Sequence, residues 1–264
     1  MKLGYRAVCT AAAAVSLVCT AAISSDTRPT APVLVELFTS EGCSSCPPAD
    51  AILARLDQEK TVSGVPVIVL SEHVDYWNGI GWKDPFSSAQ FSARQQAYSQ
   101  SFRLESVFTP QMVVDGREQF VGSDTAALNR SLDKASREAK AELRIVKAAR
   151  NGSEAEIEVE AGPGSLNSKT DLNVWVALAR DRESVAVRNG ENSGRNLTHA
   201  AVVRTLVNAG TMRRGGGFHK TVRVPLDSKL TGIRAVVFLQ PAGAGPVAAV
   251  AQRTLADSSR SLQP

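Results

Sequence analysis

The sequence predicts an α/β domain followed by an all-β, sandwich-like domain. Two strand-like apolar runs, residues 33–38 and 65–70, flank a helical segment, which is the pattern of a strand–helix–strand unit with parallel strands. After residue 140 the chain changes to short runs separated by Gly and Asn turns, a pattern typical of an antiparallel sandwich. We therefore expect a signal peptide at 1–25, a first domain at 30–141, a second domain at 142–256 and a flexible tail at 257–264.

Residues 1–25 have the features of a secretory signal. Lys2 and Arg6 give a positive start, and residues 7–22 are small or apolar and carry no charge. The alternative is an uncleaved membrane anchor, although this apolar run is short for a transmembrane span. We expect an exported protein, periplasmic or secreted, with no membrane association beyond this segment. Without Lys2 and Arg6 the formal net charge of +4 falls to about +2, which is too weak to indicate nucleic-acid binding.

Cys43 and Cys46 are the only cysteines outside the expected signal segment. A chain of this length does not need a disulfide to fold, and a ring with two intervening residues restrains little unfolded-chain entropy. The pair stands where a strand turns into a helix that runs to about Glu59. Residues three apart on a helix share a face, and the free N–H groups of a first helical turn favour a thiolate. The pattern therefore predicts a dithiol–disulfide site.

The second strand leads into His73 and Asp75. Because the carboxyl ends of parallel strands open at one edge of a sheet, we expect both side chains to lie near Cys43 and to transfer protons there. The alternative is that His73 caps the sheet edge through a hydrogen bond. Trp77 and Trp82 follow, and they form either a docking wall for a substrate or a cover for the sheet edge.

The sequence pattern also predicts the helices and strands in the rest of the first half. A helix is expected from Pro85, with Phe86, Phe91, Tyr98 and Phe102 mostly on one face. A strand then begins after Pro110, a hairpin turn and a returning strand at 118–121 follow, and a last helix runs from 125 to about 140. The resulting order is β-α-β-α-β-β-α.

This order, the Cys-x-x-Cys and the Thr109-Pro110 pair together resemble the thioredoxin superfamily. In that superfamily the proline is cis, packs beside the dithiol and helps to bind the substrate, so the resemblance implies substrate-binding roles for Thr109 and Pro110. The spacer Ser44-Ser45 differs from the Gly-Pro, Gly-His and Pro-His pairs of well-known members. The direction of electron flow is therefore left open.

Four longer sequence motifs make the resemblance more specific. They are Glu-Leu-Phe-Thr-Ser-Glu-Gly-Cys-Ser-Ser-Cys-Pro-Pro-Ala-Asp from Glu36, His-Val-Asp-Tyr-Trp from His73, Gly-Trp-Lys-Asp-Pro-Phe from Gly81 and Thr-Pro-Gln-Met-Val-Val-Asp-Gly from Thr109. They resemble a bacterial exported family with a thioredoxin-like domain, the domain of unknown function 1223. The resemblance covers nearly the whole chain after the signal segment, but this family has no settled activity.

Seven strand-like runs are expected in the second half, at 143–149, 154–160, 172–179, 202–207, 221–226, 233–240 and 247–251. The chemically dense segment there is 188–199. Its Glu191, Arg195 and His199 can reach across to the dithiol or hold a peptide. The alternative is a loop whose polar side chains bond one another and its own backbone.

The leading hypothesis is an exported thiol–disulfide oxidoreductase; whether the chain is an enzyme at all is left open. Cys43 would be the exposed attacking thiolate and Cys46 the more buried resolving thiol. Pro110 and Trp77 would bind the substrate, a protein or a small thiol or disulfide, and a further redox partner would restore the site. No cofactor besides the redox-active disulfide is expected. The alternatives are a Cu(I)-handling protein with Cys43, Cys46 and His73 as ligands, and a non-catalytic binding module.

Overall fold

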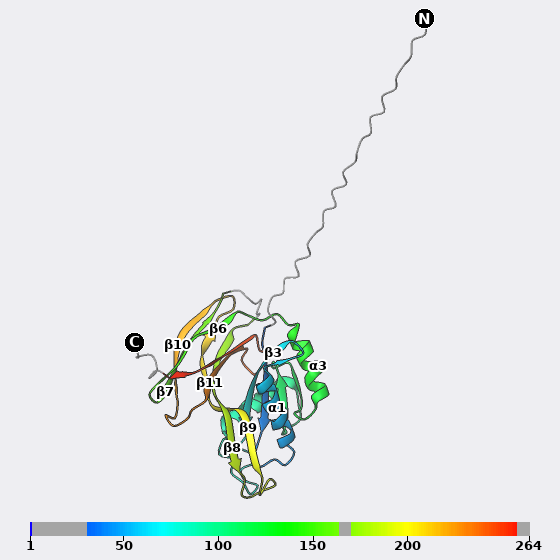
Figure 1. The fold of residues 1–264 in the computed structure, drawn as a ribbon, viewed down its shortest axis with the longest axis vertical. Coiled ribbons are helices and arrows are strands. Elements are labelled where there is room, and N and C mark those ends of the chain that lie inside the picture. Colours follow the sequence, from blue (N-terminus) through cyan, green and yellow to red (C-terminus); the bar gives the residue numbers. More distant parts are fainter. Residues whose placement is uncertain (2–30, 164–169, 258–264) are drawn as a thin grey trace.

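The computed structural model describes residue 1 and residues 31–163 and 170–257 (Figure 1). Apart from residue 1, the expected signal segment lies outside the described residues, and so does the expected tail from residue 258 onward. Of the helices in the described part, none is long and apolar enough to cross a membrane.

The first half alternates strands and helices in the expected order. Pro47 and Pro48 occupy the first two positions of α1, where a missing N–H costs little. Lys60 caps the end of the helix in a left-handed conformation with φ 56°. Helix α2 begins later than expected because Ser88 caps it, accepting a hydrogen bond from the Gln90 N–H. The elements are β1 (Val33–Thr39), α1 (Pro47–Glu59), β2 (Thr61–Val62), β3 (Val65–His73), α2 (Ala89–Phe102), β4 (Gln111–Val114), β5 (Glu118–Val121) and α3 (Thr125–Ser136).

The second half is made of strands, two of which are much longer than expected. These are β8 and β9, which form a hairpin that continues far past the expected runs at 172–179 and 202–207. The elements are β6 (Leu143–Asn151), β7 (Glu154–Ala161), β8 (Leu172–Ala186), β9 (Asn196–Met212), β10 (Phe218–Pro225), β11 (Ile233–Gln240), β12 (Ala249–Thr254) and β13 (Ala256–Asp257).

One large mixed sheet runs through both halves, and this overturns the predicted fold class. Its order is β12-β11-β8-β9-β3-β1-β4-β5, and β3 also pairs with the short β2. The joint is the parallel pairing of β3 with β9, at Ser71 and Val202. The expectation of an α/β thioredoxin-like domain followed by a separate all-β sandwich is therefore wrong: the described chain is mostly β. The physical reason is that β3 would have had an unpaired edge, and β9 covers it.

The two faces of this sheet are covered by different elements. Helices α1 and α3 cover one face, where Leu53 of α1 and Leu128 of α3 pack on Val35 and Leu37 of β1. A second sheet, β10-β7-β6-β13, packs over β8 and β11 through a separate apolar cluster that includes Ile157. Helix α2 packs on the opposite face, and β9 runs beside α1 (Figure 1). The carboxyl ends of β1 and β3 are thereby placed between α1 and the β8–β9 hairpin.

Candidate functional site

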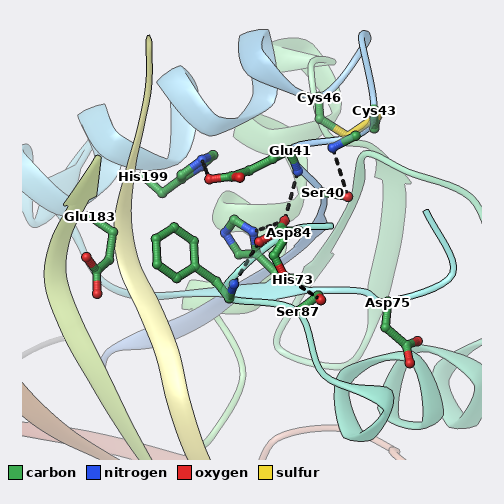
Figure 2. A network of polar contacts seen from close by, with 12 residues as sticks. Ser40, Glu41, Cys43, Cys46, His73, Asp75, Asp84, Ser87, Glu183 and His199 are labelled. Carbon is green, nitrogen blue, oxygen red and sulfur yellow. Dashed lines mark hydrogen bonds and ion pairs between the residues drawn. A yellow bond between two sulfur atoms is a disulfide. The ribbon is translucent and has the colours of Figure 1, made fainter. Parts of the chain in front are cut away.

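The disulfide closes the turn that connects β1 to α1. Cys43 and Cys46 are bonded to each other, and their Cα atoms lie 5.4 Å apart. Both cysteines are 0% exposed, whereas Ser44 and Ser45 between them face solvent. The expectation of an exposed Cys43 beside a more buried Cys46 is therefore wrong for this oxidised form. The turn lies over a buried group of charged side chains (Figure 2).

The helix start does not offer this turn the free donors that the sequence suggested. Cys46 is the N-cap residue, and the prolines at positions 47 and 48 have no N–H. The next two N–H groups, of Ala49 and Asp50, both donate to the Cys46 carbonyl oxygen, at 2.9 and 3.1 Å. The polar group beside the sulfur is instead the hydroxyl of Ser45, whose Oγ lies 3.4 Å from Cys43 Sγ. Ser45 is therefore the local donor for a Cys43 thiolate.

A loop from the second half of the chain holds the turn in place. The buried side-chain amide of Asn192 donates to the carbonyl oxygens of Glu41 and Cys43, both at 2.9 Å. Arg195 Nη1 donates to Asn192 Oδ1 at 2.9 Å and so orients this amide. The exposed Glu191 accepts from the Ser44 N–H at 3.0 Å. Hydrogen bonds from the side chain and the backbone of Ser44 lower the pKa of Glu191. Part of segment 188–199 thus reaches the dithiol turn directly.

A buried ion group lies behind the turn, centred on His199 of β9. Its Nε2 is 3.5 Å from Glu41 Oε1 (Figure 2). Its Nδ1 is 3.6 Å from Asp50 Oδ1, and both contacts are ion-pair distances rather than hydrogen bonds. Burial by itself would lower the pKa of His199, but Asp50 and Glu41 outweigh it and raise the pKa to about 10. His199 is therefore a charged imidazolium at neutral pH.

A second histidine continues this group at the end of β3. His73 Nδ1 lies 2.7 Å from Asp84 Oδ2, both residues are buried, and the ring of His73 stands edge-on to the ring of His199 with centroids 4.6 Å apart. Burial favours the neutral form of Asp84, but His73 and the N–H donors of Glu41 and Phe86 outweigh this and lower its pKa. His73 thus lies within the group, with Asp84 as its partner.

The two tryptophans fasten this site from the loop after β3. Trp82 Nε1 donates to Glu41 Oε2 at 2.7 Å, and Trp77 Nε1 donates to Thr109 Oγ1 at 2.8 Å. Trp77 also packs against Gly42, where an added Cβ would come within 3.2 Å of the Trp77 Cβ. Both side chains are only partly buried. Both indole N–H groups are thus bonded within the site, and Trp77 links the turn to the Thr109 segment.

The Thr109-Pro110 peptide bond is cis, and Pro110 lies beside the start of α1. Gly122 lies between Pro110 and Ala49 of α1. A Cβ added to this glycine would stand 2.9 Å from the Ala49 Cβ and 3.2 Å from the Pro110 Cβ. Pro110 is buried, and its carbonyl oxygen accepts from the Gly122 N–H at 2.9 Å. The structure thus places Thr109 and Pro110 along the flank of the dithiol turn.

Asp75 is turned away from the disulfide, toward α2 (Figure 2). Its Oδ1 accepts from Ser92 Oγ at 2.6 Å, so it serves to hold the loop on that helix. The Cu(I) hypothesis concerns the reduced pair and stays a prediction, because both sulfurs are used in the disulfide here. Nowhere in the described part do three or more His, Cys, Asp or Glu side chains form a group that could hold a metal ion.

Comparison with known proteins places the chain in a family. The family model "Protein of unknown function (DUF1223)" matches residues 34–240. The chain belongs to this family. The X-ray crystal structure of protein AGR_C_4864 from Agrobacterium tumefaciens is similar over 88% of this chain and 97% of that one, with 29% identity and a TM-score of 0.65. HBP35 of Porphyromonas gingivalis shares the fold over 89% of this chain and 79% of its own, with 17% identity and a TM-score of 0.63. No significant match is found among curated proteins.

The sequence patterns did not predict several site residues of this DUF1223 protein. Glu41 and Asp50 flank the Cys-x-x-Cys and Asp84 stands in the Gly-Trp-Lys-Asp-Pro-Phe phrase, so the motifs contained them without indicating a role. Asn192 lies in the segment 188–199, but the expectation named its charged neighbours and not the amide. The signal that could have found these residues is a polar side chain next to a buried strand end.

Proposed function

We propose that the protein is an exported thiol–disulfide oxidoreductase whose redox centre is the Cys43–Cys46 pair. The observation that carries the proposal is the buried charged group directly behind the disulfide turn, built from Glu41, Asp50 and His199. Burying charges is costly, and ionisable groups with perturbed pKa values cluster at functional sites. Its place behind a redox-capable pair supports a reaction that moves protons together with electrons.

The reaction is an exchange in two steps. A substrate thiolate attacks Cys43 Sγ, the Cys43–Cys46 bond breaks, and Cys46 leaves as a thiolate that takes up a proton. A second substrate thiolate then attacks the substrate sulfur of the mixed disulfide, so that Cys43 leaves as a thiolate and takes up the second proton, and the substrate becomes a disulfide. The substrate loses two electrons and two protons, and the protein gains both as a dithiol. The reverse sequence reduces a substrate disulfide.

The structure supports distinct roles for the neighbours of the two sulfurs. Ser45 is placed to donate to Cys43 as it becomes a thiolate. Asp50 follows Cys46 by one helical turn, with its N–H on the Cys46 carbonyl oxygen and its carboxylate 3.6 Å from His199. A proton taken up or released at Cys46 therefore has an exchanging group one turn away.

Substrate access requires movement of the covering loop. Neither sulfur is exposed, and a thiolate must approach the disulfide to attack it. Three hydrogen bonds, one accepted by Glu191 and two donated by Asn192, hold segment 188–195 on the turn. Opening this loop is thus part of the proposed cycle. We also propose a relation to the thioredoxin superfamily, which the Cys-x-x-Cys before α1 and the Thr109-Pro110 pair support.

Trapping of a mixed disulfide tests the proposal. In a Cys46→Ser variant the resolving thiol is missing, so treatment with oxidised glutathione should leave glutathione bound to Cys43, detected by mass spectrometry. The matched Cys43→Ser variant should react more slowly, because it lacks the sulfur beside Ser45. No adduct on either variant of the folded protein would contradict the proposal. A parallel Cu(I) competition, in which tight binding required Cys43, Cys46 and His73, would favour metal handling instead.

A further inference from the structure

A cavity of about 250 Å³ lies on the face of the large sheet opposite the disulfide. His73 and Glu72 are neighbours on β3, so their side chains point to opposite faces, and the cavity belongs to the Glu72 side under α2. It opens between α2, the strands β8 and β9, and the loop after β11. Its lining includes Gln90, Arg94, Asn173, Trp175, Leu206 and Ala244.

Arg94 is the charged group of this cavity and is only 7% exposed. Its Nε donates to Glu36 Oε1 at 2.7 Å, and its Nη2 donates to Tyr98 Oη and Gln240 Oε1, both at 3.1 Å. For Nη1 there is no hydrogen-bond or ion-pair partner within the described ranges of the chain. An arginine that lines a cavity with one nitrogen unmatched offers donors to an acceptor placed there.

Flat aromatic surfaces surround this guanidinium group. Its carbon lies 4.9 Å from the ring centre of Phe238, 5.1 Å from that of Tyr98 and 5.7 Å from that of Trp175. Trp175 stacks on Phe238 with an angle of 20° between the rings, and it is partly exposed where it lines the cavity. The cavity therefore combines a planar apolar wall with a polar donor, as small-molecule sites do.

The charges around Arg94 are already balanced. Glu36 is its buried counter-ion. Burial, together with the negative charge of Glu36, raises the pKa of Glu72 well above its ordinary value and so disfavours a second negative charge beside Arg94. An anion in the cavity would be an uncompensated buried charge, and a cation would face Arg94. A neutral acceptor matches the free donors without either penalty.

We propose that this cavity binds a small neutral molecule that places a carbonyl oxygen on Arg94 and a flat apolar group against Trp175. The volume limits the ligand to roughly the size of a single substituted ring, since ordinary ligand pockets are larger. The site is separate from the disulfide and does not depend on the redox proposal.

Binding of three probe molecules to the purified protein tests this inference. Benzamide, benzoate and benzylamine share one ring and differ in charge, and ligand-detected NMR measures each of them. Benzamide should bind saturably, and roughly tenfold or more tightly than either charged probe. The variant Ala93→Trp fills the mouth of the cavity from an exposed position on α2 and should abolish this binding. Gln96→Trp, exposed on the same helix but outside the cavity lining, should leave it unchanged.

Three results would overturn the inference. The first is no saturable binding of benzamide to the wild-type protein. The second is benzoate or benzylamine binding as tightly as benzamide, which would remove the neutral carbonyl class. The third is equal binding of benzamide to the Ala93→Trp variant, which would place the probe elsewhere. Thermal unfolding of both variants confirms that the helix is intact in each comparison.

Discussion

The side-chain amide of Asn192 donates a hydrogen bond of 2.9 Å to the carbonyl oxygen of Cys43, 149 residues away in the sequence. The same amide holds the carbonyl oxygen of Glu41. The strand hairpin of the second half therefore closes over the disulfide turn of the first half. This contact makes Asn192 the latch between the covering loop and the proposed redox centre.

Loss of this latch should make the disulfide easier to reduce. In Asn192→Ala the carbonyl oxygens of Glu41 and Cys43 lose the amide donor. In the described part of the chain, only the Cys43 carbonyl oxygen keeps another donor, the Cys46 N–H. The loss should cost about 1–3 kcal/mol, and the loop should open more often. We expect reduction by dithiothreitol to accelerate roughly tenfold, because opening limits access to the sulfurs. The control is Ser193→Ala, whose exposed side chain bonds only within the loop, to Arg188. Equal reduction rates for Asn192→Ala and the wild type would rule out the latch.

Ser45 should set the acidity of the Cys43 thiol. Its hydroxyl lies 3.4 Å from the sulfur, so in Ser45→Ala the thiolate of the reduced protein loses a donor. The pKa of the Cys43 thiol should rise by roughly one unit, because hydrogen bonds to charged groups contribute about 1.5–3 kcal/mol. Thiolate absorbance followed against pH measures the change. Ser44→Ala, which removes the neighbouring hydroxyl, should leave the titration in place; identical shifts in both variants would refute the assignment.

Because of His199, the oxidised protein should become less stable as the pH becomes alkaline. Its pKa is raised from 6.5 to about 10, so its contribution is complete below 6.5 and is lost as pH rises toward 10. The free energy of unfolding should fall by a few kcal/mol over this interval. In His199→Gln this decline should be absent. Urea titrations at several pH values provide the measurement, and parallel declines in the two proteins would show that another group is responsible.

The two buried glutamates beside Arg94 should respond in opposite ways to neutralisation. Glu72 has no hydrogen-bond partner among the described residues and a raised pKa, so holding it costs stability once pH exceeds 4.5. Glu72→Gln should therefore stabilise the protein at pH 7 by about 1 kcal/mol or more, and the gain should vanish below pH 4.5. Glu36→Gln instead removes the carboxylate that bonds Arg94 and Tyr98 and leaves Glu72, 3.5 Å from Arg94 Nε, as the counter-ion, so it should cost about 1–3 kcal/mol. Destabilisation by both changes would contradict this assignment.

Local patterns predicted much of the secondary structure. The run 233–240 matches β11, and the Cys-x-x-Cys turn stands between β1 and α1 as expected. The pairing of β3 with β9 could not be read in this way, because a sheet edge is filled by any suitable strand and the partner lies more than a hundred residues away. The fold class was wrong for this reason.

The candidate site shows the same division between local and distant information. His73 ends β3 and lies in the charged group, but the strand stops there, so the alternation of faces does not extend to Asp75. The dithiol turn is hydrogen-bonded to residues 191 and 192, far along the chain, and the first N–H donors of α1 bond to the Cys46 carbonyl oxygen. Neither feature has a sequence pattern of its own.

The reduction potential of the Cys43–Cys46 pair tests the central claim most directly. The folded protein is equilibrated in a glutathione redox series, its thiols are alkylated, and the oxidised fraction is measured by mass spectrometry. A redox centre should titrate with a midpoint between about −120 and −270 mV, the range of known thiol–disulfide oxidoreductases. Asn192→Ala, measured alongside, should reach the same equilibrium faster if the loop controls access. A pair that stays oxidised below about −300 mV in both proteins would be a structural disulfide, and the proposed function would be wrong.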